Sequence, residues 1–461
     1  MSELALDDLL ALPQAELIWP ARDEKKNRKL NGVNIDSRTV KPGEVFWAIK
    51  GEHFDGHDFI EAAAAKGAAL AVAAKKKIKN RSAMPLPLLL VPDTLRALQQ
   101  LAAAHRRKFG YPVLALTGSN GKTTTKEMIA YILGQKYNVL KTEGNLNNHI
   151  GCPLTLLRLS AQNETAVIEL GTNHPGEIAA LADMVQPDQA LITNIGGAHL
   201  AFFASEDELA AEKLSLFDRL PDGALIYRNL DDPWIADYPA TDKETVDYGW
   251  EDGADVQGRI LEMDARGCGA FRLNDAVDIR LRVPGWHNVK NALAAAAVAI
   301  RFGFSEKEIA EALAGYEGFD KRMQMREING VLVINDAYNA NALSMRAAFD
   351  TAASIQVKGR RFFALGDMLE LGKNSVKIHY GVLLAALNSK AERVLTIGPH
   401  FAEAAGRLNA DQRKRVQSFS THKELAQRLN EQLRPGDLLL LKGSRGLQME
   451  KVEEELIKDK I

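Results

Sequence analysis

The segment that most constrains the fold joins a short apolar stretch to a glycine-rich turn and a helical pattern. The apolar stretch spans residues 113–116, and Thr117-Gly-Ser-Asn-Gly-Lys-Thr-Thr124 follows it. After this turn, one face of the helical pattern carries Met128, Ile129, Ile132 and Leu133. A strand, a glycine-rich turn and a helix that begins with Lys-Thr form an arrangement that binds nucleotide phosphates. The segment therefore predicts an α/β unit built around a phosphate loop.

The residue types in this loop predict distinct roles. Glycines let backbone N–H groups turn toward phosphate, Lys122 reaches the terminal phosphates, and the Thr123 hydroxyl can ligate Mg²⁺. Only two residues separate the two glycines, so the loop is shorter than the general pattern, and a glycine-rich turn with a surface lysine is the alternative. The flanking strand and helix favour the phosphate loop. We expect the phosphates of a nucleotide to contact Gly118, Ser119, Asn120, Gly121, Lys122, Thr123 and Thr124.

Length and composition bound the kind of protein. The 461 residues suggest about three domains, and the net charge of −2 does not indicate a nucleic-acid or anionic-membrane partner. Two cysteines, Cys152 and Cys268, cannot form a disulfide framework, which fits a reducing compartment. The acidic first residues do not resemble a signal peptide, and no apolar run reaches the length of a membrane span. We expect a cytoplasmic monomer with no membrane segment.

Apolar and helical stretches divide the chain into three expected domains, at residues 1–84, 85–317 and 318–461. The first is mixed, with a strand at 45–49, a helix at 59–67 and a proline-containing linker at 83–87. In the second and third, strands alternate with helical patterns, which predicts α/β units with largely parallel sheets. A less regular insert at 243–284 predicts additional strands. The alternating strands are expected at 113–116, 166–170, 190–195, 224–227, 331–334, 361–365, 393–397 and 437–441.

Polar residues follow the ends of neighbouring strands in the central region. Glu169 ends one strand and His199 lies shortly after the next, while the phosphate loop ends the first. Ligands of open parallel sheets bind outside the carboxyl ends of the strands, so both residues should lie near Lys122 and Thr123. Thr123 and Glu169 would supply the oxygen ligands that Mg²⁺ prefers, and His199 could serve a second divalent ion or position a water. The alternatives are a helix cap or ion pair for Glu169 and a loop histidine for His199.

Further segments, together with the shortened loop, resemble the Mur ligase family of ATP-dependent amide-forming enzymes in peptidoglycan assembly. They are Gly285-Trp-His-Asn-Val-Lys-Asn291, Lys321-Arg-Met-Gln324 and Asp336-Ala-Tyr-Asn-Ala-Asn341. The resemblance implies a central P-loop ATPase-like domain, a C-terminal Rossmann-like domain and a small mixed N-terminal domain. It also implies that residues from two domains bind the nucleotide, namely His287, Asn288 and Asn291 near the adenine, with Arg322, Asp336, Tyr338 and Asn341 reaching ATP from the third domain.

The same resemblance implies roles that the residues alone do not reveal. Lys213 matches a lysine that is carbamylated in the family and would then join Thr123, Glu169 and His199 around two Mg²⁺ ions. Without the resemblance, Lys213 would be interpreted as a solvated helix lysine, and the polar loops as turns. Lys122, Glu169, His199, Lys213 and Arg322 are thus the expected catalytic residues. The residues expected near the UDP-sugar substrate are Asp36, Ser37, Arg38, Asn145, Asn148, Thr172 and Asn173.

Three segments, at 338–345, 365–372 and 442–450, resemble one branch of the family. That branch adds D-alanyl-D-alanine to UDP-N-acetylmuramoyl-tripeptide through an acyl phosphate, the last cytoplasmic step in making the cell-wall precursor. Ala342 and Ala201 depart from the pattern of the branch, at positions that affect substrate positioning rather than the reaction. A related Mur or folylpolyglutamate-type ligase with another amino-acid substrate, and an ATPase switch that ligates nothing, are the alternatives. Because two domains would share the site, we expect open and closed states.

Overall fold

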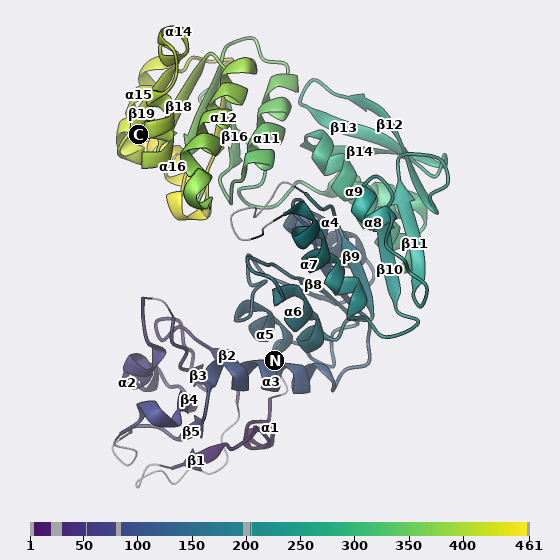
Figure 1. The fold of residues 1–461 in the computed structure, drawn as a ribbon, viewed down its shortest axis with the longest axis vertical. Coiled ribbons are helices and arrows are strands. Elements are labelled where there is room, and N and C mark those ends of the chain that lie inside the picture. Colours follow the sequence, from purple (N-terminus) through teal and green to yellow (C-terminus); the bar gives the residue numbers. More distant parts are fainter. Residues whose placement is uncertain are drawn as a thin grey trace.

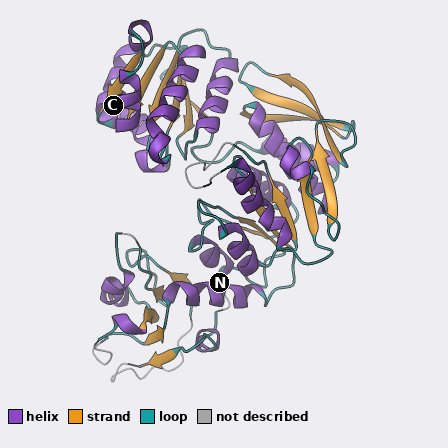
Figure 2. Ribbon diagram, viewed as in Figure 1, coloured by secondary structure: helices purple, strands orange, loops and turns teal. Residues whose placement is uncertain are grey.

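Three β-sheets organise the molecule (Figure 1). The computed structural model describes residues 4–19, 30–51, 53–79, 84–196, 203, 205–369 and 371–458. The sheets have five, nine and six strands, and the chain passes through them in that order from one end of the molecule to the other. Helices lie against each sheet (Figure 2), so the expected α/β class with three domains is confirmed.

The first sheet has the strand order β1-β5-β4-β3-β2, with β1 antiparallel to β5 and the others parallel. Its last strand, β5, lies beyond residue 84, where we expected the first domain to end. The proline-containing segment at 83–87 therefore leads into a strand of the same sheet, because β5 pairs with both β4 and β1. The elements are α1 (Leu6–Leu10), β1 (Glu16–Ile18), β2 (Val33–Asn34), β3 (Val45–Trp47), η1 (Gly56–Phe59), α2 (Ile60–Ala65), β4 (Leu70–Ala74), η2 (Lys75–Lys77) and β5 (Leu88–Val91).

The central sheet has the order β14-β13-β12-β11-β10-β9-β6-β8-β7. The strands from β7 to β12 are parallel, whereas β12, β13 and β14 form an antiparallel extension that confirms the strands expected in the insert. After β6, the chain adds β8 and β7 on one side of it and then crosses to the other side at β9. In open parallel sheets, such a reversal is where a ligand-binding crevice is expected, here at the carboxyl end of β6. The strands are β6 (Val113–Thr117), β7 (Val139–Lys141), β8 (Thr165–Glu169), β9 (Gln189–Ile192), β10 (Leu225–Asn229), β11 (Glu244–Gly249), β12 (Val256–Met263), β13 (Cys268–Leu273) and β14 (Val277–Pro284).

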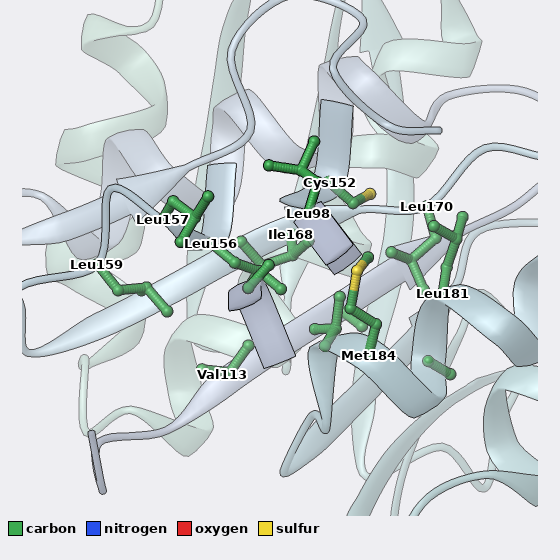
Figure 3. Close-up of a cluster of buried hydrophobic side chains, with 14 of the residues drawn as sticks. Leu98, Val113, Cys152, Leu156, Leu157, Leu159, Ile168, Leu170, Leu181 and Met184 are labelled. Carbon is green, nitrogen blue, oxygen red and sulfur yellow. The ribbon is translucent and has the colours of Figure 1, made fainter. Parts of the chain in front are cut away.

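Two apolar cores enclose this sheet, because side chains alternate between its faces along each strand. Ile168 of β8 points into one core with Leu98, Leu156 and Leu181 (Figure 3), whereas Val167 points into the other. Glu169 is the final residue of β8 and therefore lies at the carboxyl edge of the sheet. The helices of this region are α3 (Thr94–Arg106), α4 (Lys122–Leu133), α5 (Gly151–Leu156), α6 (Glu177–Val185), α7 (Glu206–Asp218), α8 (Pro233–Ala236), α9 (Trp286–Arg301) and α10 (Glu306–Gly315).

The third sheet has the order β15-β16-β20-β17-β18-β19 and is parallel except for β15. The carboxyl ends of β16, β20 and β17 therefore share one edge. The elements are β15 (Gln324–Ile328), β16 (Val331–Asp336), α11 (Ala342–Ser354), β17 (Arg361–Gly366), η4 (Gly372–Asn374), α12 (Ser375–Asn388), β18 (Arg393–Ile397), α13 (Pro399–Gly406), α14 (Ala410–Arg413), β19 (Val416–Phe419), α15 (His422–Gln432), β20 (Leu438–Lys442), η5 (Arg445–Leu447) and α16 (Glu450–Lys458).

Across the described part of the chain, every helix is too short or too polar to cross a lipid bilayer.

Candidate active site

The glycine-rich turn connects β6 directly to α4 and has the backbone shape that the sequence predicts. Gly118 has φ +148° and Gly121 has φ +81°, both in the region that favours glycine. A Cβ atom at Gly118 would lie 1.9 Å from Thr193 Oγ1, and one at Gly121 would lie 2.3 Å from Asn291 Oδ1. Both glycines are therefore required by backbone conformation and by the close approach of neighbouring elements.

We expect Gly118→Ala to lower stability by about 1–3 kcal/mol and to weaken ADP binding at least tenfold, because Thr193 and the loop must move apart. Thermal unfolding and calorimetric ADP titration measure the two effects. Gly110→Ala is the matched control, because a Cβ there meets nothing within 4 Å, and it should change neither quantity. Equal behaviour of the two variants would contradict the packing argument.

The residues that follow β9 hold the loop in place. Thr193 Oγ1 donates to the Asn120 carbonyl oxygen at 2.6 Å, and Asn194 Nδ2 donates to the same oxygen at 2.9 Å. The Asn194 Oδ1 and main-chain oxygen accept from the backbone N–H groups of Asn120 and Ser119, at 3.1 and 2.8 Å. Neither Thr193 nor Asn194 is among the site residues predicted from the sequence, although both follow the polar end of this strand. Their position after a strand next to β6 was the available signal.

Glu169 lies beside the first turn of α4, as the sheet-edge argument predicts. Its Oε1 accepts from Thr123 Oγ1 at 3.2 Å and from Asn147 Nδ2 at 2.8 Å. Its Oε2 is buried, and within the described ranges it accepts no hydrogen bond. A carboxylate oxygen with free lone pairs next to a phosphate loop suits a hard divalent cation. Asn147 was missed by the sequence analysis, although it lies between the expected residues Asn145 and Asn148.

Two cationic side chains lie at the loop, one from each of two domains. Lys122 Nζ donates to the Gly118 carbonyl oxygen at 2.6 Å, and Arg322 Nη2 donates to Thr123 Oγ1 at 2.8 Å. Desolvation lowers the pKa of Lys122 below its usual value, with Glu169 opposing and Arg322 reinforcing the shift. The two cations can therefore receive a highly charged phosphate chain between them.

The third domain reaches the phosphate loop through further contacts. Asn341 Nδ2 donates to Asn120 Oδ1 at 3.0 Å, and the Arg322 guanidinium stacks over the Tyr338 ring with 4.2 Å to its centroid. Asp336 instead faces its own domain, where its carboxylate accepts from Lys442 Nζ at 2.5 Å and from the Met323 backbone N–H. Arg322, Tyr338 and Asn341 are thus brought to the loop, whereas Asp336 orders the strand ends behind them.

Lys213 lies in α7 with only 1% of its surface exposed. Burial lowers its pKa well below the usual value; the positive charge of Lys122 adds to that shift, while Glu212 opposes it. Glu212 is occupied by the Thr172 hydroxyl at 3.0 Å and by the backbone N–H of Ile178 at 2.8 Å. The interpretation of Lys213 as a solvated helix lysine is therefore wrong, because α7 turns this side chain into the protein. His199 lies outside the described residues.

A cavity of about 230 Å³ adjoins the phosphate loop on the side of α9. Asn291 lines it, and Asn288 supports Asn291 through a hydrogen bond of 3.2 Å. In the described part of the protein, two buried polar atoms of the lining, Asp232 Oδ1 and Tyr248 Oη, have no hydrogen-bond partner. His287 is not part of the lining. Burial lowers the pKa of its imidazole, and the negative charge of Asp336 in the third domain opposes that shift. The full lining is Thr193, Asn194, Asn229, Asp231, Asp232, Tyr248, Trp250, Lys290, Asn291, Leu293 and Ala294.

Most of the remaining expected residues lie in loops, and several of them have local hydrogen-bond partners, whereas Thr124 lies in the first turn of α4. In the first domain, the Arg38 guanidinium hydrogen-bonds the Asp36 carboxylate and lowers its pKa to about 2. In the central domain, Asn148 Oδ1 accepts from two backbone N–H groups at the start of α5, and the Asn173 backbone N–H donates to Glu177. Asp36, Ser37 and Arg38 thus belong to the first sheet's loops, and Thr124, Asn145 and Thr172 lie in the central domain.

Family models match each of the three domains. The match described as "Mur ligase family, catalytic domain" covers residues 29–106, "Mur ligase middle domain" covers 116–299, and "Mur ligase, glutamate ligase domain" covers 321–445. Two relatives named UDP-N-acetylmuramoyl-tripeptide–D-alanyl-D-alanine ligase match nearly end to end. The protein from Bacillus subtilis (strain 168) is 38% identical, with 95% of each chain covered. The protein from Escherichia coli (strain K12) is 37% identical, with 93% of this chain and 94% of that one covered.

Solved structures agree with this relationship. MurF from Acinetobacter baumannii is 32% identical, superimposes with a TM-score of 0.85 and covers 98% of each chain. MurF ligase from Thermotoga maritima, solved in complex with ADP, is 27% identical with a TM-score of 0.80, covering 94% of this chain and 99% of that one.

Proposed function

This chain belongs to the Mur ligase family of ATP-dependent ligases, and from that premise we propose that it joins D-alanyl-D-alanine to UDP-N-acetylmuramoyl-tripeptide, with ATP cleaved to ADP and phosphate. The printed names of the full-length relatives support these two substrates. We also propose that the reaction takes place in the cytoplasm, where ATP is available. Because two domains of one chain supply the residues around the loop, we propose that a monomer is sufficient.

One observation carries this proposal: Arg322 of the third domain donates to Thr123 of the phosphate loop, whose hydroxyl also donates to Glu169. A ligase must bring a nucleotide and two other substrates into one water-poor volume, because an acyl phosphate exposed to water hydrolyses. A site shared between domains can open to admit substrates and close to exclude water. The contact between Asn341 and Asn120 would form part of that closure.

The reaction proceeds in two steps. A carboxylate oxygen of the tripeptide attacks the γ-phosphorus of ATP, the bond to ADP breaks, and an acyl phosphate forms. The amine of D-alanyl-D-alanine then attacks the acyl carbon, and phosphate and a proton leave. In the first step Lys122 and Arg322 offset the charge on the transferring phosphoryl group, and the backbone N–H groups of the loop orient it.

The donor set around Thr123 and Glu169 fits Mg²⁺, since the hydroxyl and the free Oε2 are hard oxygen ligands. When bound, Mg²⁺ supplies positive charge at the phosphates. We further propose that Lys213 is carbamylated and that it and His199 serve a second ion. An unprotonated lysine amine is required to attack CO₂, and burial of Lys213 favours that form. The attack gives a carbamate and releases one proton, which converts a buried neutral amine into an anionic oxygen ligand.

The cavity beside α9 would take the nucleoside of ATP. It adjoins the loop through Asn194 and Asn291, and its unpartnered atoms on Asp232 and Tyr248 can accept and donate hydrogen bonds to a base or ribose. We propose that the first domain, with Asp36, Ser37 and Arg38, binds the UDP-sugar, and that the loops with Asn145, Asn148, Thr172 and Asn173 face the same substrate. In this proposal His287, Asn288 and Asp336 shape the boundary between the central and third domains.

Phosphate release tests the function when one component is left out at a time from ATP, Mg²⁺, UDP-N-acetylmuramoyl-tripeptide and D-alanyl-D-alanine. We expect release only with the complete mixture, because neither step can turn over alone. Release with ATP alone would identify an ATPase switch instead. Release with the tripeptide and a different amine, but not with D-alanyl-D-alanine, would identify a related ligase with another amino-acid substrate.

A further inference from the structure

Lys126 is a fully buried lysine with no part in the reaction described above. It lies in α4, three residues after Thr123, and therefore on the same side of the helix. Its side chain is 0% exposed, and its Nζ donates to the Thr142 carbonyl oxygen at 2.6 Å. Lysine is almost never buried completely without charged partners, so its position calls for a specific function.

Two buried carboxylates share this ammonium group. Lys126 Nζ lies 3.2 Å from Glu127 Oε1 and 3.7 Å from Glu169 Oε2. Glu127 also pairs with Lys141. Four alternating charges thus form a row with no net charge, in the order Lys141, Glu127, Lys126 and Glu169. If Lys126 were absent, two carboxylates would remain around one desolvated space, and their mutual repulsion would push the Glu169 side chain away from its present position.

The distance to Glu169 has a chemical consequence. At 3.7 Å the ammonium group offsets the charge of Oε2 without occupying its lone pairs, and this oxygen accepts no hydrogen bond from the described residues. Lys126 also fixes the backbone behind the carboxylate, because Thr142 accepts from Lys126 through its carbonyl and from the Glu169 backbone N–H through its hydroxyl, at 2.9 Å. The position of Glu169 thus depends on Lys126 through the ion pair and through Thr142.

We propose that Lys126 is a positioning residue that holds the Glu169 side chain in place, with its Oε2 directed at the divalent cation. This inference rests on the proposed function, which places that cation between Glu169 and the nucleotide phosphates. Repulsion alone would have the opposite effect, since removing a positive charge beside a cation site strengthens cation binding. The sign of the change in cation affinity therefore separates positioning from simple repulsion.

The test is a titration of the enzyme–ADP complex with Mn²⁺, followed through the electron paramagnetic resonance signal of free Mn²⁺. We expect Lys126→Met to raise the Mn²⁺ dissociation constant at least tenfold, while ADP affinity measured with chelator stays within twofold. Glu169→Gln should show a similar loss, and the double variant should lose no more than the larger single loss. Lys141→Met is the matched control, since it removes the far lysine of the row, and it should stay within twofold of the wild type.

Three outcomes would overturn the inference: unchanged Mn²⁺ affinity in Lys126→Met, tighter binding, or a double variant whose loss is the product of the single losses. If Lys126→Met does not fold, Lys126→Met/Glu127→Gln removes one charge of each sign and is judged by the same criteria. If Glu169→Gln binds Mn²⁺ like the wild type, the proposed cation site itself fails and the inference with it. If Glu169→Gln loses Mn²⁺ and Lys126→Met does not, only the role of Lys126 is refuted.

Discussion

The Lys122→Ala variant is expected to lose about a thousandfold in kcat for phosphate release with both substrates present. That loss corresponds to about 4 kcal/mol of transition-state stabilisation, the scale of one well-placed electrostatic group in a site that excludes water. Among the residues that the structure describes, no carboxylate lies within hydrogen-bond distance of Lys122, and its Nζ donates to the Gly118 carbonyl oxygen of its own loop. Its ammonium group is therefore available to the phosphates rather than committed to the fold.

Thermal unfolding separates this catalytic loss from a folding defect. The variant should keep its melting temperature within a few degrees, because removing a desolvated cation near Arg322 relieves repulsion. Lys307→Ala provides the matched control, since that side chain is 83% exposed on α10 and should leave both quantities unchanged. Retention of more than a tenth of the wild-type rate in Lys122→Ala would remove the phosphate loop from the mechanism.

The Lys213→Met variant is expected to change activity and stability in opposite directions. Activity should fall about a thousandfold, because methionine cannot form a carbamate or ligate a cation. In buffer free of bicarbonate, stability should rise by about 1 kcal/mol, because an apolar side chain of similar volume replaces a buried amine. Activity assays and denaturant unfolding measure the two changes.

The difference in stability between the wild type and Lys213→Met should depend on pH. The folded-state pKa of Lys213 lies below its unfolded value, so the unfolded chain binds more protons between these two values. Wild-type stability should therefore rise relative to Lys213→Met as the pH increases through that interval. A ¹³C nuclear magnetic resonance signal from ¹³CO₂-treated wild type, absent in the variant, would identify the carbamate. If Lys213→Met stayed active and the wild type gave no such signal, Lys213 would be neither carbamylated nor a ligand of the cation.

Several parts of the site were predictable because they depend on local sequence. A left-handed or strained backbone before a helix requires glycine, so Gly118 and Gly121 could be assigned from the chain alone. Glu169 followed from one further step, the rule that strand ends in a parallel sheet meet at one edge. Arg322 and Asn341 needed the resemblance to the family, since they lie 199 and 221 residues from their partners in the phosphate loop.

Other residues could not be assigned from residue patterns alone, because their roles depend on burial. Asn147, Thr193 and Asn194 lie in polar loops whose composition is the same for an exposed turn and for a site wall. Lys126 and Lys213 each lie in a helical segment rich in charged or polar residues, a pattern that would suit a solvent-exposed helix face. Only the packing of α4 and α7 against the central sheet determines that both are buried.

The sequence by itself determined the phosphate loop, the alternation of strands and helices, and the order of the three α/β units. Each depends on backbone conformation or side-chain periodicity over a few neighbouring residues. Only the folded structure reveals that β5 lies between β1 and β4 in the first sheet, that Glu169 keeps one oxygen free of hydrogen bonds from the described residues, and which side chains of the third domain contact the loop. Those features arise where segments far apart in the sequence pack together and exclude water. The desolvation of polar groups depends on that packing, so no local sequence pattern can predict it.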